Sequence, residues 1–317
     1  MVYCQVYGQL DYRIYTSYIY SFYLRISNSS NLNFSWVNGF VDGYMTDLPL
    51  RFDPLNIDKP HLITLSFSHY CELARWSMDI KGIDYTEIAY AIGCHGGPIS
   101  QLRQSESQLS TSSYPGEETA QGAERRKTAV PLVCMPDGST LNDSWQIVNY
   151  YCPELTKDWC EKFDRVLGPA VRRVLYHELL SSHNPDLIDR LFDDATEVEM
   201  AIMENSKVQL GHVIKSLMAI TDESSQRDRA TIEAFFAECD ALFDAHSDQD
   251  ALALMPTAWW IAISSLSGLT LAIPEYGGKA WTAPLLEEHS VWHQSWVGKM
   301  RDTRTGQLIV DYYRNHR

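Results

Sequence analysis

A serine and a cysteine, Ser68 and Cys71, stand three positions apart at the start of a segment with helical spacing. A thiol attacks an electrophile only as the thiolate, and a free thiol with a pKa near ~8.5 is mostly protonated at neutral pH. A hydroxyl that donates to a sulfur at a helix N-terminus would favour the anion. The structural alternatives are that Ser68 only caps the helix and that Cys71 is a small buried hydrophobe.

A second polar pair, Asp143 and Ser144, stands where another short helix is expected to begin. The free N–H groups and the helix dipole at such a start attract a carboxylate, and the Ser144 hydroxyl adds a donor. Plain N-capping, which both residue types perform, is the alternative. This pair is therefore a candidate for binding an anionic group.

The sequence predicts no metal site and no disulfide framework. His289 and His293 have the spacing of two helical metal ligands, and Glu287 and Glu288 precede them. Without a defined third ligand, we interpret them as two exposed histidines. The seven cysteines are odd in number and include no Cys-x-x-Cys pair. They indicate free thiols in a reducing compartment, and hence a cytoplasmic protein.

The elements that position Ser68 follow a strand–helix–strand order. The apolar, β-branched run 62–67 predicts a buried strand. Helical spacing begins at Ser68 and ends before Gly82, which is typical of a C-cap. The alternating run 84–90 predicts a second strand. Strand, helix and strand within so few residues indicate a parallel βαβ unit.

The elements around Asp143 form a hairpin and a helix. A long loop rich in serine and glycine, 91–127, comes first and has room for one short helix. The turn sequence 136–138 joins the strand-like runs 130–135 and 139–141 in an antiparallel hairpin. Asn142 or Asp143 then caps a short helix that runs to about Tyr151.

After Pro153 the pattern is helical, with prolines near the expected helix boundaries. An uncharged stretch, 251–273, is as long as a membrane span. The proline, serines and threonines within it favour a central helix buried inside a helical domain. The expected helices are 156–182, 185–220, 226–245, 257–272 and a last stretch near 284–314.

Charge and composition exclude some partners. The formal net charge is −15 and the pI is about 5.0. A surface this negative repels a phosphate backbone and anionic lipid headgroups, so we expect neither nucleic acid nor a membrane as a partner. Residues 1–59 are rich in Tyr, Ser and Asn and are expected to form a poorly ordered extension. An organelle-targeting role for this extension remains an open alternative to a cytoplasmic location.

Three local motifs and the order of elements resemble the cytosolic glutathione transferases. SHYCELARW (68–76) with KGIDY (81–85) is similar to the family's first-helix pattern, and AVPLVCMPDGSTLNDSWQIVNY (129–150) resembles its "VP.L…DG..L..S..I..Y" block. RDTRTG (301–306) resembles the end of the C-terminal helix in many bacterial-type members. The resemblance covers 61–317. It implies an α/β thioredoxin-like domain at 60–151, followed by an all-α helical domain at 152–317.

The resemblance also implies roles for individual residues in binding glutathione. The main chain of Val130 would pair with the cysteinyl unit of glutathione, as peptide ligands do at sheet edges. Pro131 would be cis. Ser144 and its helix start would hold the γ-glutamyl carboxylate, and Asp143 would receive the ammonium group. Ser68 would donate to the sulfur.

The implied function is that of a homodimeric glutathione transferase active in detoxification, with glutathione as co-substrate and a small electrophile as the second substrate. Two alternatives stay open: glutathione-dependent thiol–disulfide exchange through Cys71, and a non-catalytic relative that serves as a binding module. The chain has His69 where the family often has proline. Its long loop 91–127 leaves the glycyl carboxylate without an assigned partner, and 125–127 (Arg-Arg-Lys) are candidates by charge only.

Overall fold

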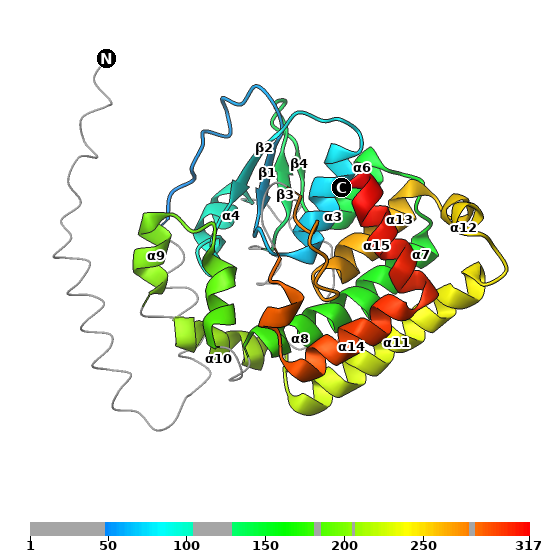
Figure 1. Cartoon of the computed structure of the whole chain (residues 1–317). Helices are drawn as coiled ribbons and strands as arrows, with labels where there is room; N and C mark the ends of the chain where they lie inside the picture. Colours follow the sequence, from blue (N-terminus) through cyan, green and yellow to red (C-terminus); the bar gives the residue numbers. More distant parts are fainter. Residues whose placement is uncertain (1–47, 104–128, 181–184, 205–206, 279–282) are drawn as a thin grey trace, which may run out of the picture. The chain divides into compact units, whose positions relative to one another are not determined.

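The computed structural model describes residues 48–103, 129–180, 185–204, 207–278 and 283–317. By its internal contacts the chain divides into Met1–Tyr44 and Met45–Arg317, and every described residue belongs to the second unit. In that unit a small sheet flanked by helices is followed by a larger group of helices (Figure 1). Most of the expected N-terminal extension therefore lies outside the described residues.

The four strands pair in the order β2–β1–β3–β4. β1 (His61–Thr64) and β2 (Thr86–Ala89) are parallel, which confirms the βαβ unit. β3 (Leu132–Cys134) runs antiparallel to both β1 and β4 (Thr140–Leu141), which confirms the hairpin. The sequence pattern predicted these four strands, although they are shorter than the expected runs, and it did not predict that β1 pairs with β3.

Alternating side chains give the sheet two covered faces. Leu62 and Val133 point to the face packed by α3 (His69–Asp79) and α6 (Ser144–Tyr151). Ile63 and Leu132 point to the opposite face, where α4 (Gly96–Leu102) packs. Figure 1 shows α4 on one side of the strands and α3 with α6 on the other. The two central strands, β1 and β3, are thereby largely buried on both faces, as in other α/β domains, while β2 and β4 are half-buried.

Residues 48–59, which the sequence analysis assigned to the extension, contact this sheet. Leu50, Phe52 and Ile57 pack against the apolar cluster of β1, β3 and α4. Arg51 donates to the carbonyl of Ala89 at 2.7 Å. The last part of the expected extension thus packs against the sheet, and the domain boundaries at 59 and 151 stay a prediction.

Two long helices expected after Pro153 are broken. Within the pattern at 185–220 a new helix begins at Glu197, because the side chain of Thr196 caps it in a reciprocal box with Glu199. The pattern at 284–314 is interrupted where the Thr303 side chain accepts from the N–H of Gly306. The helices are α7 (Lys157–Lys162), the π-helical turn η2 (Phe163–Leu167), α8 (Gly168–Leu179), η3 (Pro185–Phe192), α9 (Glu197–Met203), α10 (Lys207–Leu217), α11 (Asp222–Phe243), α12 (Asp248–Leu254), α13 (Thr257–Gly268), η4 (Leu286–Glu288), α14 (Val291–Asp302) and α15 (Arg304–His316).

The uncharged stretch 251–273 contains a buried core helix, as expected, while 252–257 are half-buried or exposed. α13 is buried from Ala258 to Gly268 and lies against α3, α8 and α15. Among the described helices, none alone has the length and apolarity needed to cross a membrane. The pair α12 and α13 passes that test only when joined, and the two helices are bent by 102°.

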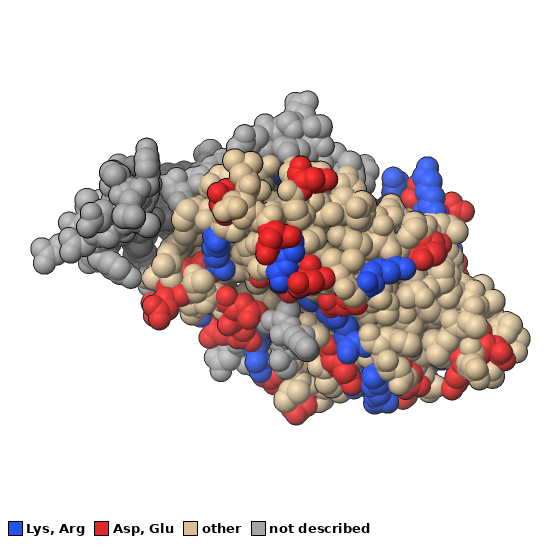
Figure 2. Space-filling model, turned by 90° about the horizontal axis from the view of Figure 1, so that it is seen from above, with Lys and Arg blue, Asp and Glu red and all other residues tan. Residues whose placement is uncertain are grey.

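The surface carries charges of both signs. On the face drawn in Figure 2, acidic and basic side chains are interspersed. Some charged side chains of the molecule are paired at the surface, such as Lys59 with Asp84 at 2.9 Å. Exposed pairs of this kind contribute about 0–1 kcal/mol each. The stability of the fold therefore depends mainly on its buried contacts.

Candidate functional site

The register of β1 and β3 brings two predicted site segments to one end of the sheet. Ile63 of β1 lies opposite Leu132 of β3 in an antiparallel pair. Continuing this register by one residue places Pro131 opposite the end of β1. The chain leaves β1 there for the loop that leads to Ser68. Val130 and Ser68 therefore belong to the same end of the sheet.

The register of β3 and β4 adds the third segment. Val133 lies opposite Leu141, so the chain after β4 continues toward the end where β3 begins. Asp143 and Ser144 follow directly and start α6. α3 and α6 pack against each other on the same face of the sheet. Both helices thus begin at the end of the sheet where Val130 lies.

Ser68 is the N-cap residue of α3, with φ −70° and ψ 124°. Its N–H donates to the carbonyl of Leu65 at 3.0 Å, and its carbonyl accepts from the N–H of Glu72 at 2.8 Å. Its half-buried side chain makes no capping hydrogen bond. The hydroxyl is one of the groups that lower the pKa of Cys71. The Ser68 hydroxyl is therefore not used to cap α3.

Cys71 lies one helical turn further, fully buried. Its sulfur accepts a hydrogen bond from the N–H of Leu65 at 3.4 Å. Burial raises the pKa of the Cys71 thiol to about 11, although Leu65, Arg75 and Ser68 act in the opposite direction. At neutral pH Cys71 is a protonated thiol that packs like a small hydrophobe.

Val130 and Pro131 are joined by a cis peptide bond, as the sequence motif predicted. Pro131 is buried and Val130 is half-buried. In the described part of the chain, the main-chain N–H and carbonyl of Val130 have no hydrogen-bond partner. A peptide-like ligand could therefore pair with this residue as an added strand.

At the start of α6, Asp143 caps the helix and Gln146, which the sequence analysis did not identify, holds the preceding residue. Asp143 accepts from the N–H of Gln146 at 2.8 Å, which is the expected N-cap. The Gln146 side chain in turn accepts from the N–H of Asn142 at 2.9 Å. Ser144 is buried at the first helical position. The Asp-x-x-Gln spacing resembles a capping box, so the role of Gln146 could have been predicted from the sequence.

A buried arginine adjoins this helix start. Arg103 follows α4, is 4% exposed, and its guanidinium donates to the carbonyl of Asn142. Nothing in the local sequence distinguishes Arg103 from a solvated arginine, so sequence reasoning did not single it out. The three basic residues at 125–127, candidates for the glycyl carboxylate, lie outside the described residues.

A charge network holds α3 and the loop before it. Arg75 donates to Glu87 at 2.8 Å, to Glu72 at 2.5 Å and to the carbonyl of Ser66 at 3.3 Å. Arg317, at the far end of the sequence, donates to Glu72 at 2.8 Å. Each of these buried charges has an opposite charge beside it, which burial requires.

His69, the departure from the family's proline, packs against the helical domain. Its ring lies 4.4 Å from that of Tyr70. Burial and the charge of Arg172 lower the pKa of His69 to about 3, against a hydrogen bond to the Gly168 backbone. A Cβ on Gly168 would lie 2.2 Å from the Tyr70 hydroxyl oxygen. The first turn of α3 and the start of α8 therefore approach as closely as a glycine allows.

The prediction that His289 and His293 are exposed is wrong, since both are buried. Arg229 of α11 donates to His293 Nδ1 at 3.1 Å and stacks over the ring of Trp292, 3.7 Å from its centroid. Burial lowers the pKa of both histidines. Among the described residues, no three His, Cys, Asp or Glu side chains come together as a metal site.

No protein-family model matches this sequence, and a search of curated proteins finds no significant match. Solved structures do match. The glutathione transferase GSTFuA3 from Phanerochaete chrysosporium is 12% identical, with a TM-score of 0.50 over 83% of this chain and 98% of its own. The β-etherase LigF from Sphingobium sp. strain SYK-6 is 10% identical (TM-score 0.40; 80% and 99% covered). A glutathione S-transferase from Rhodospirillum rubrum F11 is 17% identical (TM-score 0.30; 79% and 91%).

The GSTFuA3 comparison spans the sheet and the helices alike, because it covers 83% of this chain. At 12% identity such a likeness establishes the fold and leaves the activity open. The chain has the fold of the glutathione transferases, an α/β thioredoxin-like domain followed by an all-helical domain.

Proposed function

We propose that this chain binds glutathione at the end of the sheet where α3 and α6 begin, and directs its thiolate at a small electrophile. The observation that carries the proposal is the meeting of two helix N-termini with the strand edge at Val130. Helix N-termini favour negative charge, and glutathione brings two carboxylates and a thiol that can ionise.

The residues at this end of the sheet fit a γ-glutamyl peptide. The main-chain groups of Val130 would pair with the cysteinyl unit. Ser144, at the first helical position of α6, would donate to the carboxylate of the γ-glutamyl unit. Asp143 would bind the ammonium group of the same unit. Arg103, held beside Asn142, would supply positive charge for the second carboxylate. Glutathione itself supplies the nucleophilic sulfur.

The role proposed for Ser68 is to stabilise the glutathione thiolate. Its hydroxyl does not cap α3 and acts on the Cys71 thiol. In the complex it would donate instead to a glutathione sulfur placed at the start of α3. The dipole of α3 adds positive potential at the same point. Together these effects lower the pKa of the bound thiol, which raises the fraction of thiolate at neutral pH.

The second candidate function is thiol–disulfide exchange through Cys71, with a mixed disulfide as intermediate. Exchange requires a thiolate that a substrate disulfide can reach. Cys71 is fully buried, and burial raises its pKa to about 11. Both observations favour conjugation through Ser68 over exchange through Cys71.

A pair of substitutions tests the proposal. Ser68→Ala removes one hydrogen bond to a charged sulfur, a loss of about 1.5–3 kcal/mol. We expect conjugation of glutathione to 1-chloro-2,4-dinitrobenzene to fall by about one to two orders of magnitude. The pH–rate profile should move to higher pH, while the affinity for glutathione changes little. Cys71→Ser is the matched control and should conjugate nearly as the parent does.

Two other results would replace the proposal. A silent Ser68→Ala together with a Cys71→Ser variant inactive toward a mixed-disulfide substrate would establish the exchange mechanism. Retention of the parent on glutathione-agarose, without either activity, would indicate a non-catalytic binding module. A homodimer and a cytoplasmic, detoxifying role remain proposals, which equilibrium sedimentation and cell fractionation would test.

A further inference from the structure

The loop between β1 and α3 is hydrogen-bonded residue by residue. The N–H of Leu65 donates to Cys71, and its carbonyl accepts from the N–H of Ser68. The carbonyl of Ser66 accepts from Arg75. All of these partners belong to the loop or to α3. They tie the loop to the thioredoxin-like domain alone.

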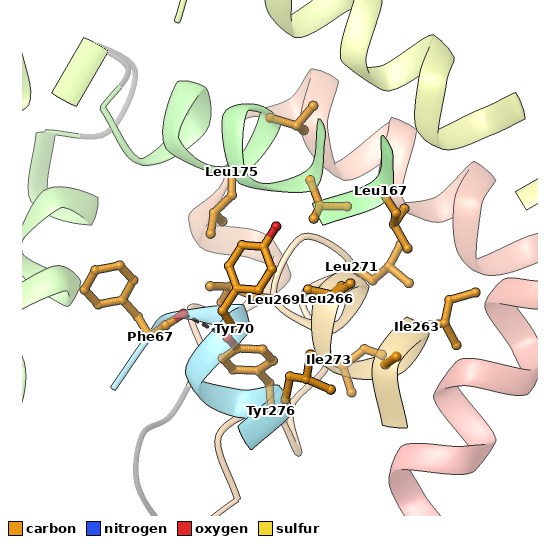
Figure 3. Close-up of a cluster of buried hydrophobic side chains, with 14 of the residues drawn as sticks. Phe67, Tyr70, Leu167, Leu175, Ile263, Leu266, Leu269, Leu271, Ile273 and Tyr276 are labelled. Carbon is orange, nitrogen blue, oxygen red and sulfur yellow. Dashed lines mark hydrogen bonds between the residues drawn. The ribbon is translucent and has the colours of Figure 1, made fainter. Parts of the chain in front are cut away.

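The carbonyl of Phe67 has a partner from the other domain. The hydroxyl of Tyr276, in the turn that follows α13, donates to it at 2.8 Å. Figure 3 shows this bond reaching from the Tyr276 side chain to the loop beside Tyr70. The two bonded residues are 209 positions apart in the sequence. This hydrogen bond couples the helical domain directly to the residue before Ser68.

The bond fixes a peptide plane. Phe67 contributes the carbonyl of that peptide and Ser68 contributes its N–H, and a peptide group is planar. Tyr276 holds the carbonyl end at 2.8 Å, while Leu65 accepts from the N–H end at 3.0 Å. With both ends held, the plane cannot rotate freely. Its orientation sets the φ angle of Ser68, and therefore the direction in which the Ser68 side chain leaves the backbone.

The chain that leads to Tyr276 is tied to two helices, α8 and α14. Thr270 donates to the carbonyl of Val171 in α8 at 3.1 Å. Arg301 of α14 donates to the carbonyl of Leu271 at 2.9 Å and also to that of Ala272, whose φ of 50° is unusual for a residue other than glycine. The turn therefore keeps a conformation that local preference alone would not select.

The Tyr276 hydroxyl is buried and protonated. Tyr276 is fully buried. Burial and the neighbouring Glu72 hold its pKa well above the ordinary value of tyrosine, against the charges of Arg75 and Arg317. The phenol stays protonated throughout the physiological range, so it can donate to the Phe67 carbonyl.

We propose that Tyr276 is a positioning residue, whose hydroxyl sets the Phe67–Ser68 peptide and through it the place of the Ser68 hydroxyl. The catalytic part of this inference rests on the proposed function, because it assigns Ser68 to the glutathione sulfur. The position of the Phe67–Ser68 peptide does not depend on that function. Hydrogen exchange measures the position of the peptide, and the pH–rate profile measures its effect on catalysis.

The test compares Tyr276→Phe with Tyr313→Phe in the full chain. Tyr313 is a matched control, since its hydroxyl is also fully buried in the helical domain and has no hydrogen-bond partner in the described structure. The first readout is hydrogen exchange, followed by mass spectrometry of peptides that span 62–70. Tyr276→Phe should speed exchange of the Ser68 amide, because the Phe67–Ser68 plane is held at one end only. Tyr313→Phe should leave exchange in these peptides unchanged.

The second readout is the pH–rate profile for conjugation. We expect Tyr276→Phe to lower kcat at neutral pH by about three- to tenfold and to shift the profile to higher pH, with KM for glutathione nearly constant. Unchanged exchange in Tyr276→Phe overturns the inference whether or not the chain is a transferase. Faster exchange with a profile that superimposes on the parent also overturns it, because the hydroxyl would then be merely structural. A parent that never lowers the pKa of bound glutathione would instead defeat the proposed function.

Discussion

Arg75 and Arg229 are both buried arginines, at 2% and 3% exposed, but their surroundings differ. Every guanidinium nitrogen of Arg75 donates to an acceptor, and Glu87 and Glu72 outweigh burial to raise its pKa. Arg229 donates one hydrogen bond to His293, and its Nε and Nη1 have no partner in the described structure. Burial lowers the pKa of Arg229 to about 10, despite Glu178 and Glu233 nearby.

The difference between the two arginines is whether the buried charge is held by carboxylates or by aromatic rings. Arg75 lies beside the candidate site, and one of its bonds holds the loop carbonyl of Ser66. The side chain of Arg229, on α11, lies against α14, where stacking over Trp292 and Trp296 replaces most hydrogen bonds. A buried cation with full ionic partners is costly to remove, whereas one without them can be replaced by an apolar side chain at little cost.

The largest contrast is expected between Arg75→Met and Arg229→Met. Arg75→Met leaves Glu72 and Glu87 without their main buried partner, and should lower the free energy of unfolding by about 3–5 kcal/mol. Arg229→Met removes a poorly satisfied charge and should cost about 1 kcal/mol or less. Urea unfolding of both variants measures the two values. Equal losses would mean that the ionic partners of Arg75 contribute no more than the stacking around Arg229.

A smaller contrast concerns two arginines of the C-terminal helix region. The side chain of Arg317 is 6% exposed, and it donates to Glu72 at 2.8 and 3.3 Å. Arg317→Gln should lower the free energy of unfolding by about 1.5–3 kcal/mol, the value of hydrogen bonds to a charged group. Arg314→Gln is the control, because Arg314 is 62% exposed and pairs with Asp311 only at the surface. Its loss should stay within about 0.5 kcal/mol; a comparable loss in both variants would argue against a special role for Glu72.

The smallest expected effect is a pH dependence at the Arg229 cluster. Burial lowers the pKa of His293 well below 6.5, and His289 and Arg229 act in the same direction. Below pH 6.5 the unfolded chain binds a proton at His293 that the folded chain does not, so stability falls as the pH falls. This group contributes up to ~1.4 kcal/mol per pH unit. His293→Leu should make the free energy of unfolding depend less on pH below pH 6.5 and leave this dependence unchanged above pH ~7. Urea unfolding of parent and variant at several pH values measures it, and equal pH dependences throughout would contradict the prediction.

Local pattern was enough to predict the elements of the candidate site. The β-branched run before Ser68, the turn at 136–138 and the cap at Asp143 each identify their own element. Once these elements are known, the sheet register brings their ends together. The start of a new helix after Thr196 could also have been predicted, because Thr196 and Glu199 have capping-box spacing.

Contacts between distant segments could not be predicted in this way. Nothing around Tyr276 indicates that its hydroxyl bonds to Phe67, since hydrogen-bond partners far apart in the sequence leave no local period. The burial of His289 and His293 has the same origin: helical spacing shows that they share a face, and only the packed neighbour α11 shows that the face is covered. Single glycines such as Gly168 give no signal either, because their role depends on what approaches them.

The contact of α3 with the C-terminal segment has a consequence for folding during synthesis. The indole of Trp76 donates to the carbonyl of His316, 240 positions later. At roughly 5–20 residues per second, a ribosome needs on the order of 10–50 s to add those residues. During that interval Glu72 and Asp79 lack the cation that Arg317 later supplies. The thioredoxin-like domain thus cannot complete its packing before the C-terminal segment is made, and we expect both domains to reach the native state together.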